Sequence, residues 1–143
     1  MWGFTLTEIL VVVSILAMLA TVGMLQLLRA RVIAYEELAL TSVRQVTKAC
    51  HFFSLVNQRF PADLTELGTA NPPYIPANLM GDGFSAEKQG YLFTYASTVD
   101  GFTLNADPKT SGVTGVRHFF VDQNLAIHVL ESGPAGPSDP VIP

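Results

Sequence analysis

Glu8 is the residue whose type and position say most about the chemistry of this chain. It stands directly before 20 residues without a charged side chain, Ile9 to Leu28, and shortly after a Gly3–Phe4 junction. A carboxylate at the edge of so long an apolar stretch is costly in lipid unless a cation pairs with it. We therefore expect Glu8 to have an ionic partner.

Cys50 is the only cysteine, so no internal disulfide can form and zinc sites built from cysteine pairs are excluded. It lies at helical spacing with Val43, Val46 and Phe53. A cysteine in such a series behaves as a small apolar residue. We expect it to be buried rather than to act as a reactive thiol.

The histidines are His51, His118 and His128. His118 and His128 fall in neighbouring predicted strands and could lie across from each other, but no third ligand has suitable spacing. The chain has no glycine-rich phosphate loop, Gly-x-Ser-x-Gly motif or His-Glu-x-x-His motif. We therefore expect a protein that is not an enzyme and that holds no metal at its histidines.

Charge and hydropathy are distributed unevenly along the chain. Apolar residues make up 49% and charged residues 14%, and the apolar excess lies before Arg29. The formal net charge is −4, and the eight basic residues are scattered without a run. Because nucleic-acid-binding surfaces gather Lys and Arg, we expect no nucleic-acid partner.

The apolar stretch predicts a membrane-spanning helix. Twenty helical residues are about 30 Å long, which is the thickness of the hydrocarbon core of a bilayer. A cleavable secretory signal is the competing interpretation, but it needs a basic start, a shorter apolar core and a small-x-small cleavage site. Met1 and Trp2 are not basic, and the best candidate cut, after Ala20, has Met18 at the −3 position.

The segment Gly3-Phe4-Thr5-Leu6-Thr7-Glu8, followed by the apolar run, resembles the N-terminus of precursors in the type IV pilin and pseudopilin family. The resemblance implies that residues 1–3 are a leader, which the prepilin peptidase removes by cutting between Gly3 and Phe4. It also implies methylation of the new amine of Phe4. Glu8 would then pair with the N-terminal ammonium of Phe4 in a neighbouring subunit during assembly. The alternative is that Glu8 only interacts favourably with the helix dipole, as a carboxylate in the first turn does.

The helix also departs from the family pattern. Thr7 stands where isoleucine or valine is more usual, and Leu25 stands where most members have a proline. Proline interrupts the backbone hydrogen bonds of a helix. Without it we expect a more continuous helix, whose weak point is Gly23.

The leader Met-Trp-Gly lacks the Lys or Arg that is usual in the family, while Arg29 and Arg31 follow the span. The positive-inside rule alone would then place the C-terminal domain in the cytoplasm, opposite to the topology of pilins. We expect a basic leader upstream of Met1, which the reading frame of the upstream DNA would reveal.

The helix is expected to continue through residues 29–57 as an amphipathic half. Apolar residues recur there at intervals of three or four, namely Val32, Tyr35, Ala39, Val43, Val46, Cys50 and Phe53. The solvated face is expected to carry Arg31, Glu36, Arg44, Lys48 and His51. One face should therefore pack on a domain.

Residues 58–90 are predicted to form a short helix and a loop, with Asp63 as the N-cap and Gly68 at the helix end. Residues 91–130 alternate between apolar and polar and contain turn signals, which predicts four strands. The tail, residues 131–143, holds four prolines and two glycines and cannot form a regular element. The fold class is thus α+β: a long N-terminal helix, with its membrane-spanning half at residues 4–28, packed against a four-stranded antiparallel meander.

On this basis we expect a structural subunit of a type IV pilus-like filament, a homopolymer serving adhesion or motility. Its precursor would lie in the bacterial inner membrane with the prepilin peptidase and the assembly machinery, and the filament would be extracellular or periplasmic. One alternative is a major-type pseudopilin of a type II secretion system. Such pseudopilins bind calcium through loop carboxylates, for which Asp82, Asp107 and Asp122 are the candidates. The other is a non-polymerising single-span membrane protein with a periplasmic binding domain.

Overall fold

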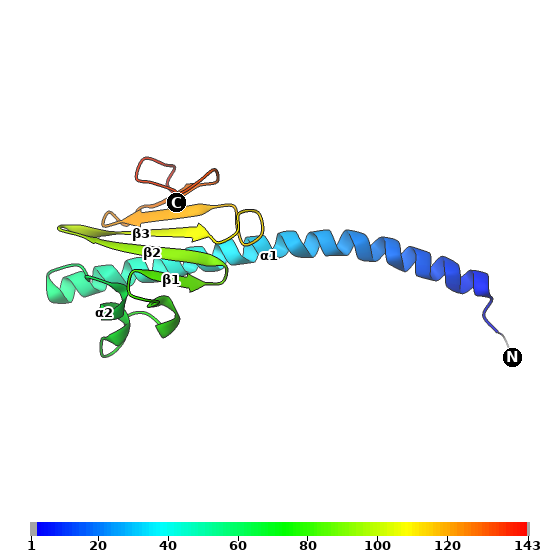
Figure 1. Ribbon diagram of the computed structural model, residues 1–143, viewed down its shortest axis with the longest axis horizontal. Coiled ribbons are helices and arrows are strands. Elements are labelled where there is room, and N and C mark those ends of the chain that lie inside the picture. The colour runs from blue at the N-terminus through cyan, green and yellow to red at the C-terminus, as the bar shows by residue number, and fades with distance from the viewer. Residues whose placement is uncertain (1–2, 143) are drawn as a thin grey trace. The chain divides into compact units, whose positions relative to one another are not determined.

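The computed structural model describes residues 3–142, so Met1 and Trp2 of the expected leader lie outside the described residues, as does Pro143. The fold is α+β, as predicted, with a 52-residue N-terminal helix packed on an antiparallel sheet (Figure 1). The elements in chain order are α1 (Leu6–Asn57), α2 (Leu64–Thr69), a 3₁₀ turn η1 (Ala77–Leu79), β1 (Ser85–Lys88), β2 (Tyr91–Thr98), β3 (Gly101–Pro108), β4 (His118–Asp122) and β5 (Ile127–Leu130). The chain divides into two compact units, residues 1–31 and 32–143.

The first unit consists mainly of the N-terminal part of α1, and its side chains are exposed all around the helix. An 18-residue window of α1 has a mean hydropathy of 2.4, and none of that window is buried. Within residues 3–142, α1 is the one helix long and apolar enough to cross a membrane. A helix that is apolar on every side is stable only in lipid or among other apolar helices.

In the second unit, the C-terminal part of α1 buries one face against the sheet. The predicted apolar stripe is confirmed from Ala39 to Phe53, while Val32 and Tyr35 are half-buried. Leu40 and Ala49 widen the buried face beyond the predicted positions. The sheet contributes its own large side chains to this core, and those that are almost completely buried are Tyr91, Phe93, Tyr95, Phe102 and Phe119. Each such side chain contributes about 1.5–3 kcal/mol to folding through the loss of water-exposed apolar surface.

The sheet has five strands in the order β1-β2-β3-β4-β5, all antiparallel neighbours, so the prediction of four strands was wrong by one. The missed strand is β1, whose sequence Ser-Ala-Glu-Lys carries no apolar alternation and buries only Ala86. A two-residue turn joins β1 to β2. Its residues Gln89 and Gly90 have φ values of 53° and 77°, the left-handed conformation that tight hairpin turns require.

The predicted short helix is confirmed as α2, and Asp63 is its N-cap. The Asp63 carboxylate accepts a hydrogen bond from the backbone N–H of Glu66 at 3.0 Å. The helix ends at Thr69, one residue beyond the predicted glycine. Hydrogen bonds from Thr65 and from backbone N–H groups lower the pKa of Asp63, although partial burial opposes them.

The tail beyond β5 lies along that strand without forming a strand of its own. The N–H of Val129 donates to the carbonyl of Pro140 at 2.9 Å, and the N–H of Ile142 donates to the carbonyl of Ile127 at 2.8 Å. The tail thereby satisfies part of the backbone of β5, whose edge would otherwise be open to another chain.

Glu36 was expected on the solvated face, but it is buried with 6% exposure. Its Oε1 accepts hydrogen bonds from the N–H groups of Val116 and Arg117 at 2.7 and 3.2 Å, and its Oε2 accepts one from Arg117 Nε at 2.7 Å. Desolvation opposes ionisation, yet these donors outweigh it and lower the pKa of Glu36. A buried carboxylate is tolerated here because hydrogen-bond donors pair with both of its oxygens. These hydrogen bonds join α1 to the segment before β4.

Candidate functional site

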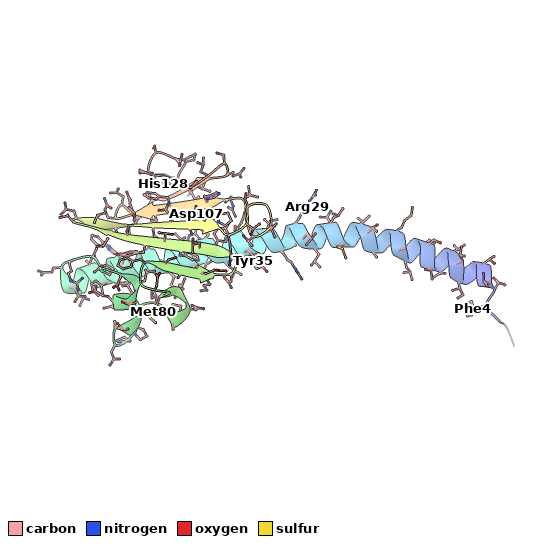
Figure 2. All side chains as sticks on the ribbon, in the orientation of Figure 1. Phe4, Arg29, Tyr35, Met80, Asp107 and His128 are labelled. Atoms are coloured by element: carbon pink, nitrogen blue, oxygen red, sulfur yellow. The ribbon has the colours of Figure 1, made fainter. Side chains whose placement is uncertain are left out.

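The candidate site is the start of α1, which holds the residues expected to serve in processing and assembly. Gly3 and Phe4 precede the first helical residue, Leu6, and both are exposed. The Phe4 side chain is 84% exposed and lies at the N-terminal end of α1 (Figure 2). A Cβ added at Gly3 would meet no atom within 4 Å. The Gly3–Phe4 bond is thus outside the helix and open to approach.

Glu8 does not point away from its own chain but closes a ring of hydrogen bonds with Thr5. Its Oε2 accepts from the Thr5 backbone N–H and from the Thr5 hydroxyl, both at 2.8 Å. In return, the Glu8 N–H donates to Thr5 Oγ1 at 3.3 Å. This reciprocal arrangement is a capping box, in which the N-cap residue and the third helical residue satisfy each other's free N–H groups.

The capping box leaves half of the carboxylate available. Glu8 Oε1 accepts no hydrogen bond within residues 3–142, and the side chain is exposed. Thr5 therefore holds Glu8 by one oxygen and leaves the other free for a cation. Thr5 is the residue of this candidate site that the sequence analysis missed, although Thr-x-x-Glu before an apolar run is a readable signature of a helix start.

Behind Glu8, large apolar side chains cover most of the helix surface in the first unit. Between Ile9 and Leu28 their exposed fractions range from 52% for Ile9 and Val12 to 77% for Met18. The two hydroxyl groups of the stretch are satisfied within the helix, since Ser14 donates to the carbonyl of Leu10 and Thr21 to that of Met18. Gln26 is the remaining long polar side chain of the stretch, and its amide needs a partner in an apolar environment.

Gly23 lies within α1, and the helix runs through it without a break. Leu25 stands where most members of the pilin family that the N-terminus resembles have a proline. It is also helical and is 65% exposed. Glycine costs about 1 kcal/mol relative to alanine in a helix interior. Melting at Gly23 during assembly stays a prediction.

Of the histidines and loop carboxylates that were considered for metal binding, the structure pairs His118 with Asp107 but brings no third candidate to them. His118 lies opposite Leu130 in the sheet, not opposite His128, and its Nδ1 is 2.6 Å from Asp107 Oδ1. Asp82 and Asp122 instead bind backbone N–H groups of their own turns. Within residues 3–142 no group of three His, Cys, Asp or Glu side chains could hold a metal ion.

Cys50 is buried with 0% exposure, which confirms its predicted place in the core. Burial raises the pKa of its thiol to about 12, against a smaller opposing effect of a hydrogen bond with Tyr95. A thiol with so high a pKa is almost never the reactive thiolate near neutral pH.

No protein-family model, curated protein or solved structure gives a significant match to this chain. The architecture is nevertheless pilin-like, because a long apolar N-terminal helix continues into an antiparallel sheet domain that covers one of its faces. What the site can do chemically follows from its own residues: an accessible peptide bond, a half-free carboxylate and an apolar helix surface.

Proposed function

We propose that this protein is the structural subunit of a type IV pilus-like filament. The observation that carries the proposal is the position of the exposed Glu8 carboxylate at the start of an apolar helix segment. That segment is apolar on every side, and none of its apolar surface is buried within the chain. Such a surface needs lipid before assembly and other helices after it. A polymer of these helices provides both the apolar surroundings and a cation for Glu8.

Processing supplies that cation in this proposal. Cleavage between Gly3 and Phe4 by a prepilin peptidase releases an α-amine on Phe4, which is protonated near neutral pH and is then methylated. The Phe4 ammonium of an incoming subunit binds Glu8 Oε1, while Thr5 keeps holding Oε2. In the apolar core of a filament the attraction is strong but desolvation offsets much of it. The pair therefore selects and aligns the subunit more than it adds stability.

If the protein is a pilin, we expect filaments on the cell surface that disappear when the gene is deleted. A major-type pseudopilin of a type II secretion system has the same chemistry at Glu8, and it predicts failed enzyme export instead. A single-span membrane protein that never polymerises predicts no cleavage before Phe4 and normal behaviour of Glu8→Ala.

Intact-mass spectrometry of the full chain from its native host tests the proposal. The mature protein is expected to begin at Phe4, and its mass should exceed that calculated for residues 4–143 by one methyl group. Glu8→Gln is expected to be processed but absent from sheared filaments, whereas Glu131→Gln, an exposed acid of the tail, should assemble normally. Native material that keeps residues 1–3, or Glu8→Gln filaments at wild-type yield, would refute it.

A further inference from the structure

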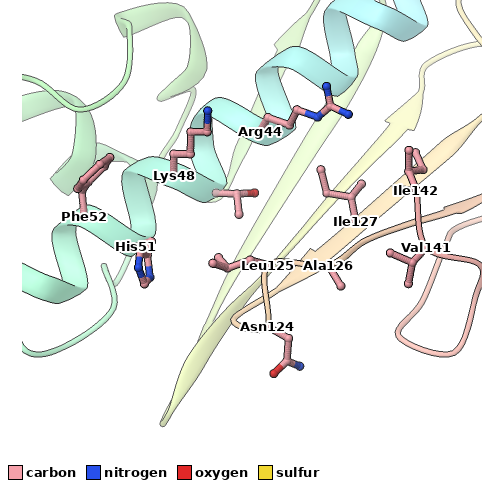
Figure 3. Close-up of a pocket in the computed structure, with 11 residues that line it drawn as sticks. Arg44, Lys48, His51, Phe52, Asn124, Leu125, Ala126, Ile127, Val141 and Ile142 are labelled. Carbon is pink, nitrogen blue, oxygen red and sulfur yellow. The ribbon is translucent and has the colours of Figure 1, made fainter.

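A groove in the second unit has no role in the proposed helix assembly. It has a volume of about 770 Å³ and lies between α1 on one side and the β4–β5 turn, β5 and the tail on the other (Figure 3). The apolar residues that line it are Phe52, Leu125, Ala126, Ile127, Val141 and Ile142. Phe52 and Val141 are 58% and 53% exposed, so the groove is open to solvent.

The α1 side of the groove is basic. Arg44, Lys48 and His51 are spaced by four and three residues, which places them along one face of the helix. Neither Arg44 nor Lys48 forms a salt bridge with any residue from 3 to 142. No acidic side chain lines the groove. An acidic protein therefore carries two unneutralised cations beside an apolar cavity, which favours an occupant with an acid and an apolar side chain.

The chain itself displays such a pair of residues at the tip of the β2–β3 hairpin. Val99 is 100% exposed, and the adjacent Asp100 is exposed with no salt bridge or side-chain hydrogen bond to a residue in the described range. The regular alternation of buried and exposed residues in β2 stops at Ala96, and the last three residues are all exposed. The tip thus extends beyond the core.

A single exposed valine is ordinary on a protein surface. Here it occurs together with a free carboxylate, and the two match the groove in polarity and in charge. In the second unit, exposed Leu38 follows Glu37, but that carboxylate is paired with Arg117. Exposed Phe84 lies two residues after Asp82, whose carboxylate already accepts hydrogen bonds from the backbone N–H groups of Phe84 and Ser85. Asp100 remains free.

We propose that the β2–β3 tip of one copy of this chain docks in the groove of a second copy. Val99 enters the apolar part of the groove, beside Phe52 and Val141, and Asp100 pairs with Arg44 and Lys48. Tip and groove are different patches of the same surface, so each copy can give its tip to one neighbour and receive the tip of another. A contact of this heterologous kind links successive subunits into a ring or an open chain, depending on the rotation between neighbours.

Disulfide cross-linking in membranes tests the contact directly. Two differently tagged full-length chains are co-expressed, one carrying Val99→Cys and the other Val141→Cys, and the membranes are mildly oxidised. A disulfide forms only when the two Cα atoms come within about 7 Å, and native Cys50 is buried and does not compete. A product carrying both tags is expected.

Two matched pairs serve as controls. The first control is Val113→Cys, at a position in the β3–β4 connection where the native valine is 63% exposed. The second is Phe84→Cys, two residues after Asp82. Paired with Val141→Cys, each is expected to give little product. Equal cross-linking in either control would overturn the proposal, because the contact would then not be specific to the tip.

Charge reversal provides a second readout that does not depend on the cysteine geometry. Asp100→Lys is expected to reduce the cross-link about fivefold, and combining it with Arg44→Glu and Lys48→Glu in the partner chain should restore it. Absence of rescue would overturn the proposal. A different occupant would also overturn it. The sign would be an absent cross-link together with a small anion that native mass spectrometry detects on the purified wild-type chain but not on the Arg44→Glu/Lys48→Glu variant.

The outcome is separable from that of the filament proposal. The cross-link is scored in membranes whether or not filaments form. If the cross-link appears but no polymer does, the contact stands and the filament proposal fails. If wild-type filaments form and the cross-link is absent, the filament proposal stands and this contact is refuted.

Discussion

Replacing Glu36 with glutamine should destabilise the second unit by about 2–3 kcal/mol. The glutamine amide oxygen can keep the two hydrogen bonds from the N–H groups of Val116 and Arg117. The amide nitrogen, however, is a donor and would face the Arg117 Nε–H, which now donates to Glu36 Oε2 at 2.7 Å. The variant thus loses one hydrogen bond between charged groups, worth about 1.5–3 kcal/mol, and places two donors against each other.

Glu37→Gln is the matched control for this variant. Glu37 is the next residue, has the same charge and contacts the same guanidinium, through Arg117 Nη2 at 2.9 Å. Its side chain is 60% exposed, compared with 8% for Glu36. An exposed ion pair contributes about 0–1 kcal/mol, so the control should change stability by less than about 1 kcal/mol.

The single cysteine provides the assay. Because Cys50 is fully buried, a maleimide that fluoresces on reaction with a thiol reports unfolding of the second unit in the detergent-solubilised full chain. For a domain of roughly 100 residues, 1 kcal/mol corresponds to about 4 °C in Tm. Glu36→Gln is then expected to melt about 8–12 °C below the wild type. Equal shifts in Glu36→Gln and Glu37→Gln would refute the assignment of Glu36 as the buried partner.

The pH dependence of the stability difference between the wild type and Glu36→Gln gives an independent check. The folded state lowers the pKa of Glu36 from its ordinary value of 4.5, so folding favours the ionised form. That contribution is fully present above pH 4.5 and is lost as the pH falls through the lowered pKa. The stability gap between wild type and Glu36→Gln should therefore narrow below pH 4.5. A gap that widens there would contradict the hydrogen-bond geometry.

Two further substitutions test contacts described above. Thr5→Val removes both the N-cap hydroxyl and its bond to Glu8. We expect a loss of about 1 kcal/mol at the helix start and slower filament assembly, measured by sedimentation. Thr21→Val, which removes a hydroxyl that donates to the carbonyl of Met18, should assemble normally, and equal behaviour of the two variants would argue against the capping box. Tyr95→Phe removes the buried hydroxyl that donates to the carbonyl of Pro61 at 2.6 Å. We expect the second unit to lose about 1–2 kcal/mol of stability, measured as a lower Tm in the same maleimide assay. An unchanged Tm would show that this hydrogen bond contributes nothing to stability.

Much of this fold could be predicted because hydrophobic periodicity reports which face of an element is buried. The stripe from Ala39 to Phe53, the N-cap Asp63 and the strands β2 to β5 follow from local patterns of this kind. Strand β1 could not be recognised, since Ser-Ala-Glu-Lys has no such pattern and pairs only because β2 offers it a free edge.

The misplacement of Glu36 has a similar cause. Its burial depends on Arg117, which is 81 residues away in the sequence, and a local pattern says nothing about so distant a partner. The candidate site divides in the same way. Glu8 stands out in the sequence because it precedes an uncharged run, whereas the free Oε1 becomes visible only once Thr5 is seen to hold Oε2.

The attachment of the sheet to α1 also has a mechanical consequence. Within residues 3–142 no backbone hydrogen bond joins α1 to a strand, so side-chain packing and the Glu36 contacts hold the two together. A pulling force along α1 would load these contacts in shear while leaving the strand-to-strand bonds unstressed. The helix should therefore slip out from beneath an intact sheet, and the rupture force should fall when Glu36 is neutralised.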